Sequence, residues 1–176
     1  MSDYYGYIIP ECFIDTRLTQ FLLRNRVNHQ HSCNNVVKVM CTKYSDDFAV
    51  GIIDNDKHGV SYLKDFQLIG QTEHLAFYNH IHGKHYIITV CPAMDRFIMD
   101  CANETQNSLK TFDLPTTLKD FTRLTKDEKI LSDSRITQLL FAIQGHDEIV
   151  KLKNVLCYLL QVRYNASVND ITALVQ

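Results

Sequence analysis

The spacing of apolar residues changes along the chain, and the first half shows the patterns of β-strands. Residues 4–10 combine aromatic and β-branched side chains and predict a first strand. Residues 48–53 are almost continuously apolar, which predicts a strand buried on both faces. Strands of that kind are typical of parallel sheets whose two faces are covered by helices.

Further elements are predicted around these two strands. Asp15 is a suitable N-cap, and the apolar stripe that follows it predicts a helix over residues 15–25. The run 36–41 predicts a second strand, and residues 75–80 and 85–90 predict a hairpin. Pro92 suits the first turn of a helix that ends near Cys101.

The last third of the chain has the periodicity of helices. Thr125 and Glu128 have the spacing of a capping box and predict a helix start. Apolar stripes predict two amphipathic helices over residues 136–143 and 150–162. The stretch 103–114 is rich in small polar residues and predicts a loop.

These patterns together predict an α/β fold. We expect a Rossmann-like, mostly parallel sheet flanked by helices, with a C-terminal helical appendage. The polar stretch suggests a soft boundary, with an α/β domain in residues 1–103 and a helical extension in residues 115–176. The extension is expected to pack on or beside the first domain.

Composition and charge narrow the range of partners. The chain has 176 residues, of which 45% are hydrophobic and 22% charged, as in ordinary globular domains. Its 18 Lys and Arg against 20 Asp and Glu give a formal net charge of −2. A basic coat for nucleic acid is therefore not expected, so contact with a polyanion has to be local, metal-mediated or supplied by a partner.

Targeting signals and cysteine usage favour a cytoplasmic protein without membrane contact. No apolar run reaches the length of a membrane span, and the N-terminal residues lack the pattern of a secretory signal. The six cysteines are scattered and are most simply free thiols in a reducing compartment.

Three acidic residues stand at the ends of predicted strands. Glu11 directly follows the first strand, and Asp54 and Asp56 follow the buried strand. Ligands of open parallel sheets bind beyond the carboxyl ends of the strands, so these side chains are expected to converge if the two strands are neighbours. Asp15 opens the first helix and can reach the same place.

Such a group of carboxylates predicts a metal ion. Carboxylates that lie close together repel one another unless a cation neutralises them. Hard oxygen ligands without a nearby set of thiolates favour Mg²⁺ or Mn²⁺ over Zn²⁺. The chemistry that fits is metal-assisted phosphoryl transfer, in which bound ions activate water and stabilise the departing oxygen.

Two motifs resemble those of the Toprim domain. The first is IIPECFID at residues 8–15, and the second is GIIDNDKHG at residues 51–59. The Toprim pattern is a strand ending in Glu-Gly-x-x-Asp and a later strand ending in Asp-x-Asp-x-x-Gly. The resemblance covers roughly residues 4–100, and the helical remainder matches no pattern that we can name.

The resemblance implies a Toprim-type parallel sheet and divalent-metal chemistry on the phosphodiesters of DNA or RNA. Glu11 corresponds to the glutamate of the family, to which acid–base work or metal binding is assigned. Asp54 and Asp56 correspond to its metal-binding pair, and Asp15 to the aspartate after the glutamate. The expected function is therefore a nuclease with Glu11, Asp54 and Asp56 as catalytic residues and Mg²⁺ or Mn²⁺ as cofactor.

The first motif departs from the family pattern at two positions. Cys12 stands where the family has Gly and takes a positive φ less readily, and Pro10 removes a backbone donor. Toprim domains occur in topoisomerases, primases, RNA-maturation nucleases and nucleases of bacterial antiphage systems. Small Toprim nucleases of the antiphage kind work beside a separate ATPase. The resemblance thus implies a regulated effector with such a protein partner, and self-association is left open.

Several other residues are candidates for the same site. Asp95 follows the strand over residues 85–90 and opens a helix, where it can complete a second metal site or simply favour the first helical turn. The candidate phosphate contacts are Lys57, His58, Lys84 and Arg96.

Alternative functions remain open from the sequence alone. The degenerate first motif allows a non-catalytic Toprim-like subunit or binding module of a larger nucleoprotein assembly. A small-molecule phosphatase would use the same metal chemistry. His80, His82 and His85 are a weak zinc signal because no fourth ligand is adjacent, and a hairpin tip near phosphate, or a solvated tip, fits them better.

Overall fold

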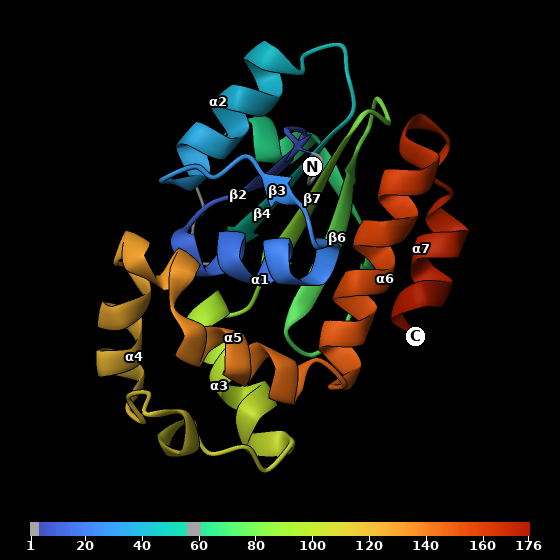
Figure 1. Ribbon diagram of the computed structural model, residues 1–176. Helices are drawn as coiled ribbons and strands as arrows, with labels where there is room; N and C mark the ends of the chain where they lie inside the picture. The colour runs from blue at the N-terminus through green and yellow to red at the C-terminus, as the bar shows by residue number, and fades with distance from the viewer. Residues whose placement is uncertain (1–3, 56–60) are drawn as a thin grey trace.

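The computed structural model describes residues 4–55 and 61–176, and these residues form an α/β fold (Figure 1). The strands are β1 (Tyr4–Tyr5), β2 (Ile8–Pro10), β3 (Arg26–Val27), β4 (Ala49–Asp54), β5 (Phe66–Gln71), β6 (Leu75–His80) and β7 (His85–Val90). The α-helices are α1 (Phe13–Leu23), α2 (Cys33–Lys43), α3 (Met94–Glu104), α4 (Leu118–Thr125), α5 (Ser134–Ile143), α6 (Asp147–Val162) and α7 (Val168–Val175). Short 3₁₀ helices are η1 (Ser61–Asp65), η2 (Leu109–Phe112), η3 (Glu128–Ser132) and η4 (Arg163–Asn165).

The main sheet has five strands in the order β2-β4-β7-β6-β5, and β1 and β3 form a separate parallel pair. β4 pairs in parallel with both β2 and β7, as its continuous apolar sequence predicts. The sheet is mixed rather than mostly parallel, because β6 runs antiparallel to both β7 and β5. The predicted hairpin causes this difference: a tight turn at Gly83, where φ is +72°, reverses the chain within the sheet.

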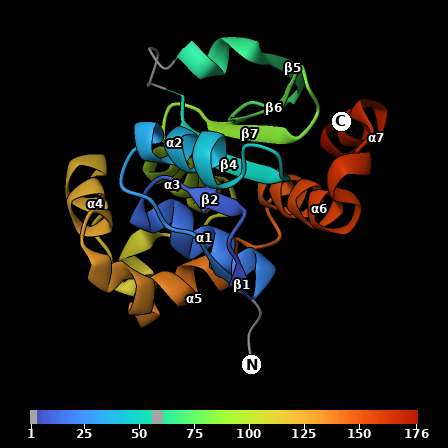
Figure 2. The ribbon, with the colours of Figure 1, turned by 90° about the horizontal axis from the view of Figure 1, so that it is seen from above.

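Alternate residues of the central strands enter two different apolar clusters. Val50 and Ile52 of β4 belong to the larger cluster, which includes residues of α1, α3, α5 and α6. Ala49 and Ile53 of β4 belong to a smaller cluster with residues of α2. The two clusters therefore place α2 against one face of the sheet and α1, α3 and α5 against the other. Figure 2 shows the strands in the order β5, β6, β7, β4 and β2, with α6 and α7 at one side of the molecule.

Residues 36–41, predicted as a strand, are part of helix α2. The Ser32 hydroxyl accepts a hydrogen bond from Asn35 N at 3.2 Å and so caps the amino end of the helix. Val36, Val37 and Met40 are buried, and they share one helical face against β4. A short β-branched run fits a strand or a buried helix face, and in this chain the cap and the packing favour the helix.

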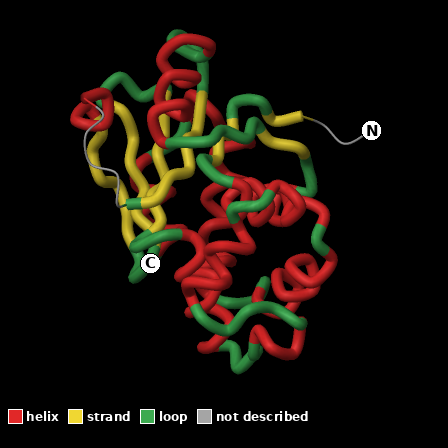
Figure 3. Tube along the Cα trace, turned by 90° about the vertical axis from the view of Figure 1, so that its left-hand side faces the viewer, coloured by secondary structure: helices red, strands yellow, loops and turns green. Residues whose placement is uncertain are grey.

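The helices after α3 differ in part from the prediction. The predicted helices over residues 136–143 and 150–162 are confirmed as parts of α5 and α6. Thr125, the expected helix start, is instead the last residue of α4, whose cap is Thr117. Figure 3 shows the strands in the upper half of the view and a large group of helices in the lower half.

Both edges of the main sheet are occupied by other parts of the chain. At the β5 edge, the Thr172 hydroxyl of α7 donates to the Ile69 carbonyl at 2.7 Å, beside a β-bulge. A side chain at Gly70 would meet Val175 at 2.7 Å, so glycine allows α7 to approach this closely. At the β2 edge, backbone N–H groups of residues 28 and 30 donate to the carbonyls of Ile8 and Pro10, each at 2.9 Å.

Candidate functional site

Two of the predicted acids, Glu11 and Asp54, lie side by side at the carboxyl ends of neighbouring parallel strands. Glu11 follows β2, and its backbone N–H donates to the Ile52 carbonyl of β4 at 2.9 Å. The Asp54 backbone N–H donates to Glu11 Oε2 at 3.3 Å. The Glu11 side chain is only 2% exposed, so a carboxylate is held inside the protein at the strand ends.

Asp15 brings a third carboxyl group to this place from the first turn of α1. Its Oδ2 accepts a hydrogen bond from the Cys12 backbone at 3.1 Å. Its Oδ1 is buried and has no hydrogen-bond partner among the described residues. Burial raises the pKa of Asp15 far above its usual value, and the negative charges of Asp54 and Asp95 raise that pKa further.

Asp95 joins the group from the first turn of α3, which begins shortly after β7. The Met94 backbone N–H, at the start of the same helix, donates to Asp54 Oδ1 at 3.1 Å. The Thr125 hydroxyl donates to Asp95 Oδ1 at 2.5 Å. The amino ends of α1 and α3 therefore both lie beside the acids, where their dipoles favour negative charge. We call Glu11, Asp15, Asp54 and Asp95 the acid cluster.

Cys12 follows Glu11, and its backbone conformation does not require glycine. Its φ is −128°, so this position does not use the left-handed conformation for which glycine is suited. Burial strongly raises the pKa of the Cys12 thiol, and the nearby charges of Asp15 and Asp54 add to the effect. The thiol is therefore protonated at neutral pH and is not a nucleophile.

The remaining predicted site residues differ in whether they lie near the acid cluster, far from it or outside the described residues. Asp56, Lys57 and His58 lie outside the described residues. Arg96 lies on α3 next to Asp95, and its guanidinium pairs with Asp100 at 2.7 Å. Lys84 is distant from the acid cluster because β7 runs parallel to β4: His85 pairs with Ala49, at the start of β4, and Lys84 Nζ lies 3.2 Å from the Asp46 carbonyl.

His29 lies close to the acid cluster and was not among the predicted site residues. Its ring stacks on Phe13 with centroids 4.4 Å apart, and its Nδ1 lies 2.8 Å from the Thr16 hydroxyl. Burial lowers the pKa of His29, and the neighbouring His31 lowers it further, so the ring is neutral at neutral pH. The only sequence signal was a polar run that contains two histidines.

The hairpin histidines do not form a zinc site. Both ring nitrogens of His85 are occupied, one by the Tyr62 hydroxyl and the other, Nε2, by the Tyr44 carbonyl at 2.8 Å. Across residues 4–55 and 61–176, no group of three or more His, Cys, Asp or Glu side chains is arranged to hold a metal ion.

The acid cluster nevertheless has the donor chemistry that Mg²⁺ uses. Its carboxylate oxygens are hard ligands, and Asp15 offers a buried oxygen that no described residue satisfies. Mg²⁺ needs only one or two protein carboxylates when water and phosphate oxygens complete its octahedron. The residues present are therefore compatible with this cofactor. A cavity of about 170 Å³ opens beside Asp54, and its wall includes Asn55, Tyr78 and Thr89.

Comparison of the chain with protein-family models, with curated proteins and with solved structures finds no match. Within the described residues, no helix is long and apolar enough to cross a membrane. The class that the fold itself defines is α/β, with a mixed five-stranded sheet between helices.

Proposed function

We propose that this protein is a divalent-metal-dependent nuclease that cleaves phosphodiester bonds of DNA or RNA. The observation that supports it best is the meeting of Glu11 and Asp54 at adjacent parallel strand ends, with the unsatisfied carboxylate oxygen of Asp15 nearby. Buried carboxylates in such proximity are costly unless a cation joins them. The two Toprim-like motifs, which place acids at these same strand ends, support the same function.

In this proposal the side chains of the acid cluster hold and orient the metal. Asp54 and Glu11 bind Mg²⁺ or Mn²⁺, with Asp56 as the further ligand that the motif implies, and Asp15 and Asp95 are the additional candidate ligands. The bound metal supplies Lewis-acid activation of water and of the phosphoryl group. Glu11 also serves as the group that accepts or returns a proton. Regulation by a separate ATPase belongs to this proposal and is supported by the motif resemblance alone.

The test is a cleavage assay with Mg²⁺ or Mn²⁺ on plasmid DNA, single-stranded DNA and RNA. Asp54→Asn and Glu11→Gln are suitable variants because each keeps the acceptor oxygen that its backbone donor uses. We expect each to lower cleavage by about a hundredfold or more, since even outer-shell changes at metal sites cost about 10–100-fold. The matched control is Asp46→Asn. The Asp46 side chain is 95% exposed and lies just before the amino end of β4, whereas Asp54 is at the carboxyl end of that strand.

A second readout separates the alternatives. Millimolar Mn²⁺ should raise the melting temperature of the wild-type protein and not that of Asp54→Asn, because a ligand that binds the folded state stabilises it. Unchanged cleavage in Asp54→Asn would eliminate the assignment. Absence of both cleavage and Mn²⁺ stabilisation would favour a non-catalytic subunit, and turnover of phosphomonoesters alone would indicate a phosphatase.

A further inference from the structure

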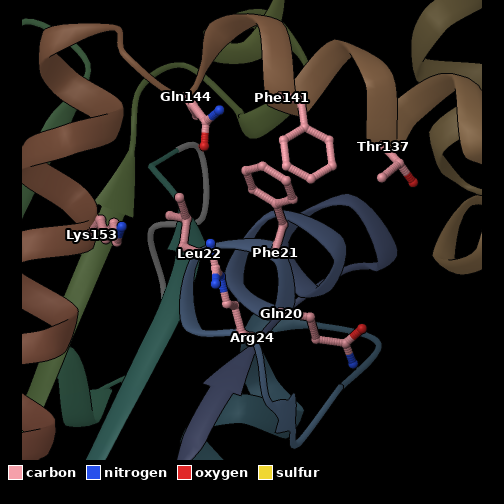
Figure 4. A pocket seen from close by; sticks show the side chains of 8 residues that line it. All are labelled: Gln20, Phe21, Leu22, Arg24, Thr137, Phe141, Gln144 and Lys153. Carbon is pink, nitrogen blue, oxygen red and sulfur yellow. The ribbon is translucent and has the colours of Figure 1, made fainter.

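A second cavity lies at the opposite end of α1 from the acid cluster (Figure 4). Asp15 is in the first turn of α1, whereas Phe21 and Arg24 of the cavity wall stand at the carboxyl end of the helix. At about 1.5 Å per helical residue, the two places are roughly 13 Å apart along the axis. The cavity has a volume of about 330 Å³, and its wall comes from α1, α5 and α6.

Two aromatic rings form one wall of the cavity. Phe21 of α1 and Phe141 of α5 point toward one another, with ring centroids 4.9 Å apart and ring planes at 87°. Phe141 is 56% exposed although its ring contacts Phe21. Part of this ring is therefore available for stacking with a planar group.

The polar groups of the wall are cationic or neutral. Arg24 and Lys153 line the cavity, and neither side chain makes a hydrogen bond or ion pair with another described residue. Gln20 and Gln144 also line it, and no Asp or Glu among the described residues does. In a chain of net charge −2, a wall with two unpaired cations selects for an anion.

We propose that this cavity binds one nucleotide unit. The base stacks on the exposed part of Phe141, and the phosphate accepts hydrogen bonds from Arg24 and Lys153. Base–aromatic stacking and cation–phosphate pairing are the two interactions by which proteins hold nucleotides without reading their sequence. The volume lies at the lower end of the range for small-molecule sites, as a single nucleotide requires. The site goes beyond the proposed metal centre and does not depend on it.

The test measures binding by calorimetry in EDTA, so that the acid cluster holds no metal. The probes are AMP, inorganic phosphate and an oligothymidylate of about ten nucleotides. AMP binding at the cavity, weakened about tenfold or more in Phe141→Ala and in Lys153→Gln, identifies a free nucleotide as the ligand. If the oligothymidylate binds, AMP does not, and the same two variants weaken that binding, the ligand is a nucleotide within a strand. Either result supports the proposal.

Matched controls keep the result interpretable. Lys119→Gln removes one exposed lysine of α4 and should leave binding unchanged. Because the assay in EDTA needs no metal at the acid cluster, failure of the metal proposal and failure of this one can be told apart. Phe141 and Lys153 are both exposed, and their variants are expected to fold. Three outcomes overturn the proposal: neither AMP nor the oligothymidylate binds, binding ignores both variants, or inorganic phosphate binds as tightly as AMP.

Discussion

Asp15 lies in surroundings that disfavour its own charge. Its side chain is 1% exposed, and one of its oxygens has no partner among the described residues. The charges of Asp54 and Asp95 add repulsion to the cost of burial. Positions of this kind reduce the stability of a protein and are typical of functional sites.

We expect Asp15→Asn to stabilise the metal-free protein. The amide cannot ionise, so it removes the cost of burying an ionisable group beside other acids. It also keeps an acceptor for the Cys12 N–H and provides a donor beside the other carboxylates. A gain of about 1 kcal/mol would raise the Tm by about 2–4 °C in a chain of this size. Thermal unfolding in EDTA checks this, with Asp46→Asn as the exposed control. A lower Tm for Asp15→Asn would show that the carboxylate is stabilising where it stands.

The sequence predicts the core of the acid cluster because strand direction follows from the apolar pattern. A strand apolar on both faces implies parallel neighbours, and parallel neighbours bring Glu11 and Asp54 to one edge. The position of Lys84 could not be inferred in this way, since it depends on which strand pairs with β4. His29 could not be found either, because an irregular segment that runs beside β2, rather than a periodic pattern, brings it to Phe13.

At the scale of elements, the prediction succeeds for strongly patterned segments. The β6–β7 hairpin and helices α5 and α6 are confirmed with ends close to those expected. Residues 4–10 form two short strands instead of one, because the chain turns at residues 6 and 7. β5 was missed: its glycine and glutamines carry little strand signal, and pairing with β6 and contact with α7 stabilise it.

Glu148 connects α6 to the start of β6, and its loss should weaken this contact. Its Oε1 accepts from the His74 N–H at 3.0 Å, and its Oε2 lies 2.5 Å from His74 Nδ1. We expect Glu148→Gln to lower the free energy of unfolding at pH 7 by about 1–3 kcal/mol. Urea unfolding measures this, and Glu73→Gln, a neighbouring exposed position, is the control.

The cost of Glu148→Gln should depend on pH. Burial acts to raise the pKa of Glu148, but hydrogen bonds from His74 and Thr72 outweigh it and lower that pKa. A carboxyl group with a lowered pKa contributes stability above its unfolded pKa and loses it as the pH falls through the folded value. The difference between wild type and Glu148→Gln should therefore shrink below about pH 4. A difference that grows on acidification would contradict this account.

At the scale of the whole molecule, the sheet and the later helices share one apolar cluster. Ile8 and Val50 of the strands belong to the same cluster as Leu139 of α5 and Leu156 of α6. Neither part buries its apolar face without the other, so they are expected to fold together.

We expect a single cooperative unfolding transition. Far-UV circular dichroism reports mainly the helices. Because the chain has no Trp, tyrosine fluorescence can be followed as a second probe, and it reports mainly the strand region. Leu139→Ala should lower the stability seen by both probes equally, by about 2–5 kcal/mol, because Leu139 is fully buried. Loss of the helical signal at a lower urea concentration than the tyrosine signal would show two independent units.

The coverage of both margins of the sheet also limits how this protein can assemble. An open margin invites a strand from another chain, which continues the hydrogen-bonded ladder and leads to fibres or strand-swapped pairs. Here α7 contacts one margin through Thr172, and the segment over residues 28–30 is bonded to the other. A strand from a second copy, or from a regulatory protein, would therefore have to displace these contacts before it could extend the sheet.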